Sequence, residues 1–181
     1  GADVAVSNAA GQRAAQLASY HGHQAVFDLL SQHNKIPRVC RTARNAFDRE
    51  GNPYNRPDVS NIPPHERGSF VGTAHSKLEP LKAALKMEPR LAHAAATTSE
   101  GAVEAGAHMG RADIVELLLQ HGAPYSLATA VLMNDFTTVR TLLTQDPARI
   151  NTRGAHGYAL TWYPILAGGN VEMMQLLLDH G

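Results

Sequence analysis

The stretch GRADIVELLLQHGA at residues 110–123 recurs along the chain in altered copies, and this recurrence predicts the fold. A close copy, GNVEMMQLLLDHG, stands at 169–181, and an earlier one, GHQAVFDLL, at 22–30. Two weaker copies begin at Lys77 and Asp135. Recurrence at about 33 residues indicates a solenoid, in which each unit buries its apolar face only against its neighbours. A solenoid predicts a function on an extended surface rather than in one enclosed pocket.

Each unit has the pattern of two short helices joined by a turn. In the third unit, 102–109 is a small, alanine-rich first helix that Gly110 interrupts. The second helix has an apolar stripe over 114–119 at helical spacing. Gly122 then suits the left-handed position that ends a helix. Thin first helices let the thicker second helices of neighbouring units approach, so we expect small and large layers to alternate.

These units resemble ankyrin repeats. The family pattern of Gly-His, a valine pair, Leu-Leu-Leu and a final Gly-Ala is best matched from Gly110 onward. The Thr-Pro-Leu-His tetrad of the family is lost, and RAAQLA (13–18) and LTWY (160–163) stand in its place. The resemblance implies an all-α ankyrin-repeat solenoid of about five stacked helix-turn-helix repeats. It also implies a scaffold for protein–protein interaction, and not an enzyme, that presents a concave groove and hairpin loops to a macromolecular partner.

The spacing of the units predicts the domain organisation. We expect one domain over 1–181, with an insertion at about 34–67 and repeats at about 8–33, 68–91, 98–123, 124–150 and 157–181. One interval between units is only 25 residues, so we expect a tight turn and no hairpin between Gly122 and Ser126. Pro89 and Pro147 should end the second helices of units two and four. Such a partly double repeat is a variant that we associate with divergent bacterial ankyrin proteins.

The insertion divides into two halves of different composition. Its first half, 37–50, is predicted to be a helix with Val39, Ala43 and Phe47 on one face and arginines on the remainder. Those arginines would either bind phosphate or an acidic peptide, or form a solvated face. The proline-rich half, 51–68, is predicted to be extended and pinned across the solenoid by Tyr54 and Ile62.

Composition narrows the classes of function. Lys+Arg and Asp+Glu both number 16, so no strong field would attract nucleic acid. No apolar run approaches the roughly 18 residues of a membrane span. The single cysteine, Cys40, is expected to be a small core residue and excludes a disulfide framework within the chain. We expect a cytoplasmic protein with no cofactor, although a cleaved leader would also fit. Because the chain begins and ends at the same phase of the repeat, we expect the natural protein to continue on one or both sides.

A group of histidines and a glutamate is the main chemical feature. Glu104 and His108 are spaced i, i+4 on one first helix, and His75 holds the place of His108 one unit earlier. His156 could approach them only if the hairpin before the last unit folds over the groove. The group would form a structural hydrogen-bond network, a ligand-binding groove, or a metal or acid–base site. The network is the expectation here, with no bound metal.

Other residues of the groove and the loops are candidate contacts for a protein partner. Trp162 and Tyr163 are aromatic residues with a polar group, as interface anchors often are, although Trp162 could instead fill the space left by the lost tetrad. The full set of expected contact residues is Tyr20, His75, Glu104, His108, Met109, Met133, Arg153, His156, Tyr158, Trp162 and Tyr163.

Overall fold

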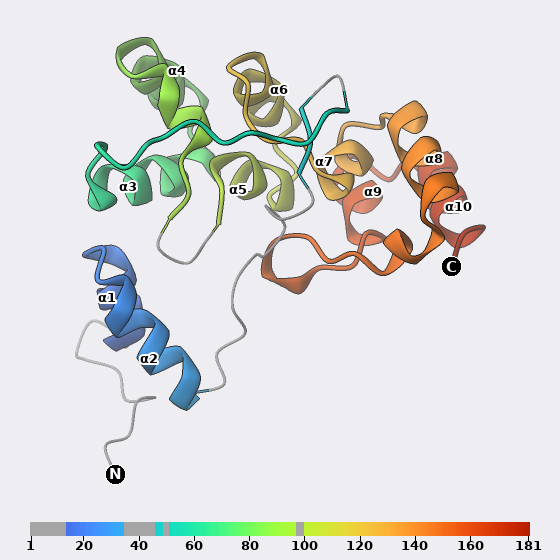
Figure 1. Cartoon of the computed structure of the whole chain (residues 1–181). Helices are drawn as coiled ribbons and strands as arrows, with labels where there is room; N and C mark the ends of the chain where they lie inside the picture. The colour runs from blue at the N-terminus through green and yellow to red at the C-terminus, as the bar shows by residue number, and fades with distance from the viewer. Residues whose placement is uncertain (1–13, 35–45, 49–50, 97–99) are drawn as a thin grey trace.

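The chain is built from pairs of short helices connected by tight turns (Figure 1). The computed structural model describes residues 14–34, 46–48, 51–96 and 100–181. Within these ranges the secondary structure consists of helices and isolated β-bridges, so the expected all-α class is confirmed. The helices are α1 Ala14–Tyr20, α2 Gln24–Asn34, α3 Pro64–Ala74, α4 Leu78–Met87, α5 Ala102–His108, α6 Ala112–Gln120, α7 Leu127–Leu132, α8 Phe136–Gln145, α9 Trp162–Leu166 and α10 Val171–Leu178.

Short 3₁₀ helices follow two of the second helices. Pro89 opens η2 (Pro89–His93) after α4, and Pro147 opens η3 (Pro147–Asn151) after α8. Both prolines therefore end an α-helix, as predicted, because proline lacks the amide that continues the α-helical hydrogen bonds. A third, η4 (Ala155–Gly157), lies at the tip of a hairpin before α9.

The first helices of the pairs form one layer. Helix α3 contacts α5, α5 contacts α7, and α7 contacts α9. Helix α5 also touches α9 directly, and a Cβ added at Gly110 would lie 2.8 Å from the carbonyl oxygen of Leu166. This close approach brings the hairpin before α9 toward the end of α5, where η4 contacts it.

One apolar core runs through these pairs. It includes Phe70, Leu81, Leu118, Leu143 and Leu177, all less than 5% exposed, and extends from α3 to α10. The pair α1–α2 has a small core of its own, made of Ala15, Ala18 and Phe27. It meets the larger body where α1 contacts α3.

The insertion differs in part from its prediction. Most of the helix expected over 37–50 falls at 37–45 and 49–50, which lie outside the described residues. Cys40 lies outside them too. At 46–48 the chain is extended, because Phe47 forms antiparallel bridges to Pro53 and Tyr125. Tyr125 belongs to the short linker between α6 and α7, so the insertion pairs with this linker. The linker has no hairpin of its own, as the sequence predicted.

The proline-rich half crosses the helix pairs, as Figure 1 shows for the segment that precedes α3. Val59 and Ile62 are buried, and the Tyr54 hydroxyl lies 2.6 Å from His93 Nδ1. The expectation that this half is extended as far as residue 68 is wrong. Helix α3 begins at Pro64, since a proline in the first helical turn loses no hydrogen bond. Among the described residues no helix combines the length and apolarity needed to cross a bilayer.

Candidate metal centre

Two histidines reach the candidate centre from equivalent helix ends. His75 caps α3, and His108 is the last residue of α5. Each directs Nδ1 to the backbone carbonyl four residues earlier, Val71 O for His75 and Glu104 O for His108, at 3.0 Å in both cases. Their ring centroids are 5.0 Å apart. Because α3 and α5 pack side by side, the repeat spacing brings the two rings into contact, as the sequence suggested.

The carboxylate at the centre belongs to Glu100, a residue that the sequence analysis did not select. Glu100 lies at the base of a hairpin closed by the Ala95–Gly101 bridge, and Ala96 N donates to its carbonyl oxygen at 2.8 Å. Glu100 Oε1 lies 3.2 Å from His108 Nδ1 and 3.7 Å from His75 Nε2. A residue outside the helices leaves no helical periodicity in the sequence, so the closeness of this side chain to the two rings is seen only in the structure.

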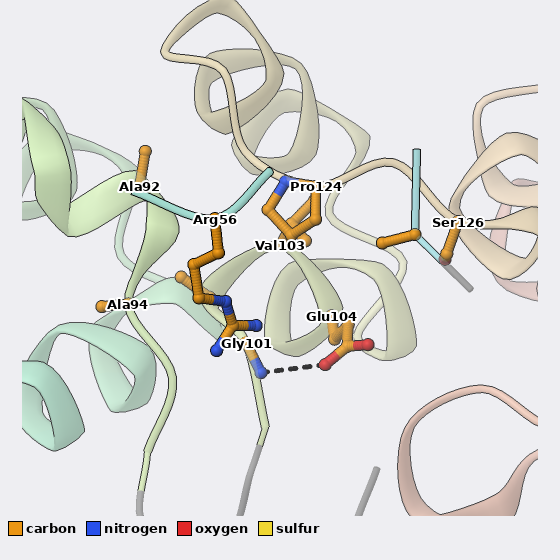
Figure 2. A pocket seen from close by; sticks show the side chains of 10 residues that line it. Arg56, Ala92, Ala94, Gly101, Val103, Glu104, Pro124 and Ser126 are labelled. Atoms are coloured by element: carbon orange, nitrogen blue, oxygen red, sulfur yellow. Dashed lines mark hydrogen bonds between the residues drawn. The ribbon is translucent and has the colours of Figure 1, made fainter. Parts of the chain in front are cut away.

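Glu104, the carboxylate chosen from the sequence, has another role. Its Oε2 accepts a hydrogen bond of 2.9 Å from the amide of Gly101, the residue that precedes α5 (Figure 2). A glutamate at the third helical position commonly folds back to satisfy this free amide. It lines a small pocket together with Arg56 of the insertion. That pocket has a volume of only about 10 Å³, which is room for roughly one water molecule.

The third histidine arrives from a distant part of the chain. His156 lies in η4, at the tip of the hairpin closed by the Arg153–Ala159 bridge. Its Nε2 is 3.4 Å from Glu100 Oε1, and its ring centroid is 4.5 Å from that of His108. The backbone of His156 has φ 55°, a left-handed conformation that is uncommon outside glycine. The hairpin therefore does fold over the end of α5, which was the condition set for His156 to join the group.

The four side chains have the composition and spacing of a transition-metal site. One potential ligand atom from each of His75, Glu100, His108 and His156 lies within 4.8 Å of the others. Zn²⁺ binds imidazole nitrogen and carboxylate oxygen at about 2.0–2.2 Å, so neighbouring ligand atoms in a tetrahedral site lie roughly 3.3 Å apart. The separations of 3.2, 3.4 and 3.7 Å around Glu100 Oε1 are close to that value.

The central oxygen lacks a well-formed hydrogen bond. Glu100 Oε1 is buried and makes no hydrogen bond of ordinary geometry, although the His156 ring, 3.4 Å away, lowers its pKa as a long hydrogen-bond partner. The distances to the imidazoles match an ion pair but exceed or lie at the limit of a good N–H···O bond. Burial raises the pKa of Glu100, and the charges of His75 and His156 only partly oppose this. The imidazoles therefore offset only part of the cost of burying the carboxylate charge, whereas a divalent cation would offset it.

Protonation of the rings also favours a cation at this point. Since Val71 O can only accept, His75 Nδ1 carries a proton, and its Nε2 is the ring atom that faces Glu100 Oε1, at 3.7 Å. A proton or a metal ion between Nε2 and Oε1 would join these two atoms. Burial lowers the pKa of His108 to about 4, so this ring is neutral at pH 7, as a metal ligand must be.

His108 must adjust slightly to bind a metal ion. Its Nδ1 lies between Glu104 O at 3.0 Å and Glu100 Oε1 at 3.2 Å. Either its proton moves to Nε2 and frees Nδ1, or the ring turns and presents Nε2. The same contact between Nδ1 and a backbone carbonyl occurs at His121 and His180, which also lie just after helices. This contact is therefore a local feature of helix ends that orients the histidine ring. The cluster differs from the other helix ends because Glu100 also lies beside its rings.

The remaining predicted contact residues fall into three groups. Met109 and Trp162 are each half-exposed, and Arg153 is exposed, while Tyr158 is partly buried and stacks on Trp162. Met133 is partly buried against the core. Tyr20 ends α1, and its side chain lies outside the described part.

Two further predicted contacts, Tyr163 and Glu104, have buried side chains, and their role in binding a partner stays a prediction. Tyr163 is 1% exposed and packs in the core, with its hydroxyl against Gly154. Glu104 is 8% exposed and caps α5 instead of facing the groove.

Comparison of the sequence with protein-family models and with curated proteins found no match. The functional argument therefore depends on the geometry of the cluster.

Proposed function

We propose that this chain is an ankyrin-type repeat scaffold that binds a divalent transition-metal ion through His75, Glu100, His108 and His156. The observation that carries the proposal is the convergence of three imidazoles on one buried carboxylate oxygen that makes no hydrogen bond of ordinary geometry. Three nitrogen ligands and one carboxylate suit Zn²⁺ and its first-row neighbours, whereas Ca²⁺ and Mg²⁺ prefer oxygen ligands alone.

The repeat architecture is the second part of the proposal. The ankyrin-type assignment is supported by first helices that contact one another in sequence order. It is also supported by hairpins that precede α5 and α9, closed by the Ala95–Gly101 and Arg153–Ala159 bridges. The units of this scaffold place His75 and His108 at equivalent positions, so the metal site depends on repetition.

The number of ligands favours binding over catalysis. Catalytic zinc sites keep one coordination position for water or substrate, whereas structural sites fill all four with protein atoms. Here one potential ligand atom from each of four protein groups lies within 4.8 Å of the others. We therefore propose a binding protein and not a metalloenzyme.

Metal titration of the purified protein tests the site directly. Co²⁺ added to metal-free protein should bind with one-to-one stoichiometry and give the visible absorption of tetrahedral nitrogen and oxygen coordination, which Zn²⁺ should then displace. His108→Ala should weaken binding at least about tenfold, since loss of a ligand costs more than loss of an outer hydrogen bond. His121→Ala is the matched control, because His121 makes the same contact at a helix end but lies outside the cluster. Equal binding by His108→Ala and wild type would overturn the proposal.

A specific observation also favours contact with a protein partner. Met109, Trp162 and Ile165 are each at least half-exposed and belong to the end of α5 and to α9, two helices that touch. Exposed large apolar groups that gather in this way are typical of interaction surfaces. We propose that this scaffold presents the surface to a protein partner. Met109→Ser with Trp162→Ser should abolish capture of a protein that wild type retains, whereas Met87→Ser, exposed at the end of α4, should not. Identical capture by all three proteins would eliminate this second proposal.

A further inference from the structure

The four groups of the candidate centre are not equally attached to the body of the protein. His75 and His108 are anchored at the ends of helices, and the amide of Gly101 beside Glu100 is bonded to Glu104. His156 belongs to a hairpin that starts 45 residues after α5 ends. A metal ion that binds all four groups would therefore join two parts of the chain that are distant in sequence.

The tip of that hairpin is held by two hydrogen bonds of η4, from Gly157 N to Gly154 O and from Tyr158 N to Ala155 O, and by the buried Ala155, and the His156 ring reaches from it toward Glu100. His156 and Gly157 are consecutive left-handed residues, with φ 55° and 76°. A non-glycine residue in this region is strained and persists where surrounding contacts impose it. The base is closed by Gly154 N donating to Tyr158 O at 2.9 Å, and Gly154 rests against the Tyr163 ring. At the tip, the His156 side chain is 37% exposed and lies 3.4 Å from Glu100.

The hairpin also positions an aromatic pair. Tyr158, two residues after His156, stacks on Trp162 with ring centroids 4.9 Å apart and an interplanar angle of 13°. Trp162 opens α9 and is half-exposed, so the pair forms part of the surface beside the cluster. Because Tyr158 belongs to the hairpin and Trp162 to α9, the stacking of the two rings depends on where the hairpin lies.

We infer that the bound metal ion links the 153–159 hairpin to the ends of α3 and α5 and thereby fixes the position of the Tyr158–Trp162 pair on the surface. We call this role of the metal ion a clasp. This inference rests on the proposed metal site and describes a consequence of metal binding there. A closed, four-ligand site suits this role, because structural metal ions stabilise the arrangement of the segments that bind them. Occupancy of the site would then control the shape of the adjacent apolar surface.

The chain supplies its own reporter. Trp162 is its single tryptophan, so the intrinsic fluorescence excited at long wavelength comes from the stacked pair. Zn²⁺, which does not quench by itself, should change the emission and raise the anisotropy of Trp162 in proportion to occupancy. In Tyr158→Ala, which keeps all four metal-binding groups, Co²⁺ should bind as in wild type while the Trp162 response falls at least about fivefold.

Proteolysis measures the hairpin independently. Arg153 is exposed at the base of the hairpin, and trypsin cleavage after it requires local opening. Saturating Zn²⁺ should slow this cleavage about tenfold in the full chain. Cleavage after Lys82, exposed on α4, should not change and serves as the internal control for effects of Zn²⁺ on trypsin. In His156→Ala, the protection of Arg153 should be lost even at metal concentrations that fill the remaining ligands.

The results separate the clasp from the site itself. If Co²⁺ binds through the cluster but neither Trp162 emission nor cleavage after Arg153 responds, the clasp is overturned and the metal site stands. If no metal ion binds, both proposals fail. Protection that persists in His156→Ala would also overturn the clasp, because another contact would then hold the hairpin.

Discussion

At the scale of single residues, Leu118 shows how the two helices of a pair are held together. Its side chain has no exposed surface, and α6, on which it lies, packs against α5. Leu118→Ala should lower the free energy of unfolding by about 2–5 kcal/mol, since it removes buried methyl groups and leaves a cavity. Leu178→Ala is the matched control, because Leu178 is 57% exposed, and its cost should stay below about 0.5 kcal/mol. Urea denaturation of both variants gives the comparison, and equal costs would mean that the packing described for α6 is wrong.

The candidate site shows at the same scale how far the sequence could lead. His75 and His108 could be paired in advance because they hold equivalent positions in two similar stretches of sequence, and the helices formed there, α3 and α5, are in contact. Glu104 was the wrong carboxylate because an i, i+4 spacing gives the face of a helix but not whether the side chain instead caps it. Glu100 could not be predicted, since it lies outside the helices, beside the Ala95–Gly101 bridge, and follows no periodic pattern.

At the scale of elements, two helical glycines differ in how closely a neighbouring helix approaches them. A Cβ at Gly106 of α5 would lie 2.9 Å from Ile114 Cγ2 and 3.3 Å from Val115 Cγ2 on α6, whereas a Cβ at Gly68 of α3 would meet nothing within 4 Å. Gly106→Ala should therefore destabilise the protein by about 1–3 kcal/mol through overpacking. Gly68→Ala should stabilise it by about 0.5–1 kcal/mol, since alanine favours the helix. Thermal unfolding followed by circular dichroism measures both, and stabilisation by Gly106→Ala would contradict the described α5–α6 contact.

At the scale of the whole molecule, the crossing segment of the insertion is joined to the second helix pair by Tyr54 and His93. Burial raises the pKa of Tyr54 from its ordinary 10.0 to about 12, although the charge of Arg56 opposes this. Burial and Arg56 also lower the pKa of His93, so Nδ1 of its neutral ring can accept a hydrogen bond from the Tyr54 hydroxyl. The insertion is therefore held to this helix pair by the Tyr54–His93 hydrogen bond, which requires the protonated phenol of Tyr54.

This bond predicts how stability depends on alkaline pH. Since the folded chain holds the Tyr54 proton more tightly than the unfolded chain, its contribution is complete below about pH 10 and is lost as pH rises toward 12. Tyr54→Phe should cost about 0.5–1.5 kcal/mol at pH 8 and should show a smaller fall in stability between pH 10 and 12 than wild type. Chemical denaturation across this range tests it, and parallel curves for the two proteins would exclude the Tyr54 contribution.

The sequence by itself determined the helix pairs, the shortened turn before α7 and the prolines that end α4 and α8. These features follow from hydrophobic periodicity, residue spacing and the missing amide of proline, all of which are local. Only the tertiary structure decided that α5 touches α9, that the hairpin folds over the end of α5, and that Glu100 and His156 meet His75 and His108 there. The physical reason is that these contacts depend on how tightly successive pairs stack and curve, which is set by packing between segments far apart in the chain.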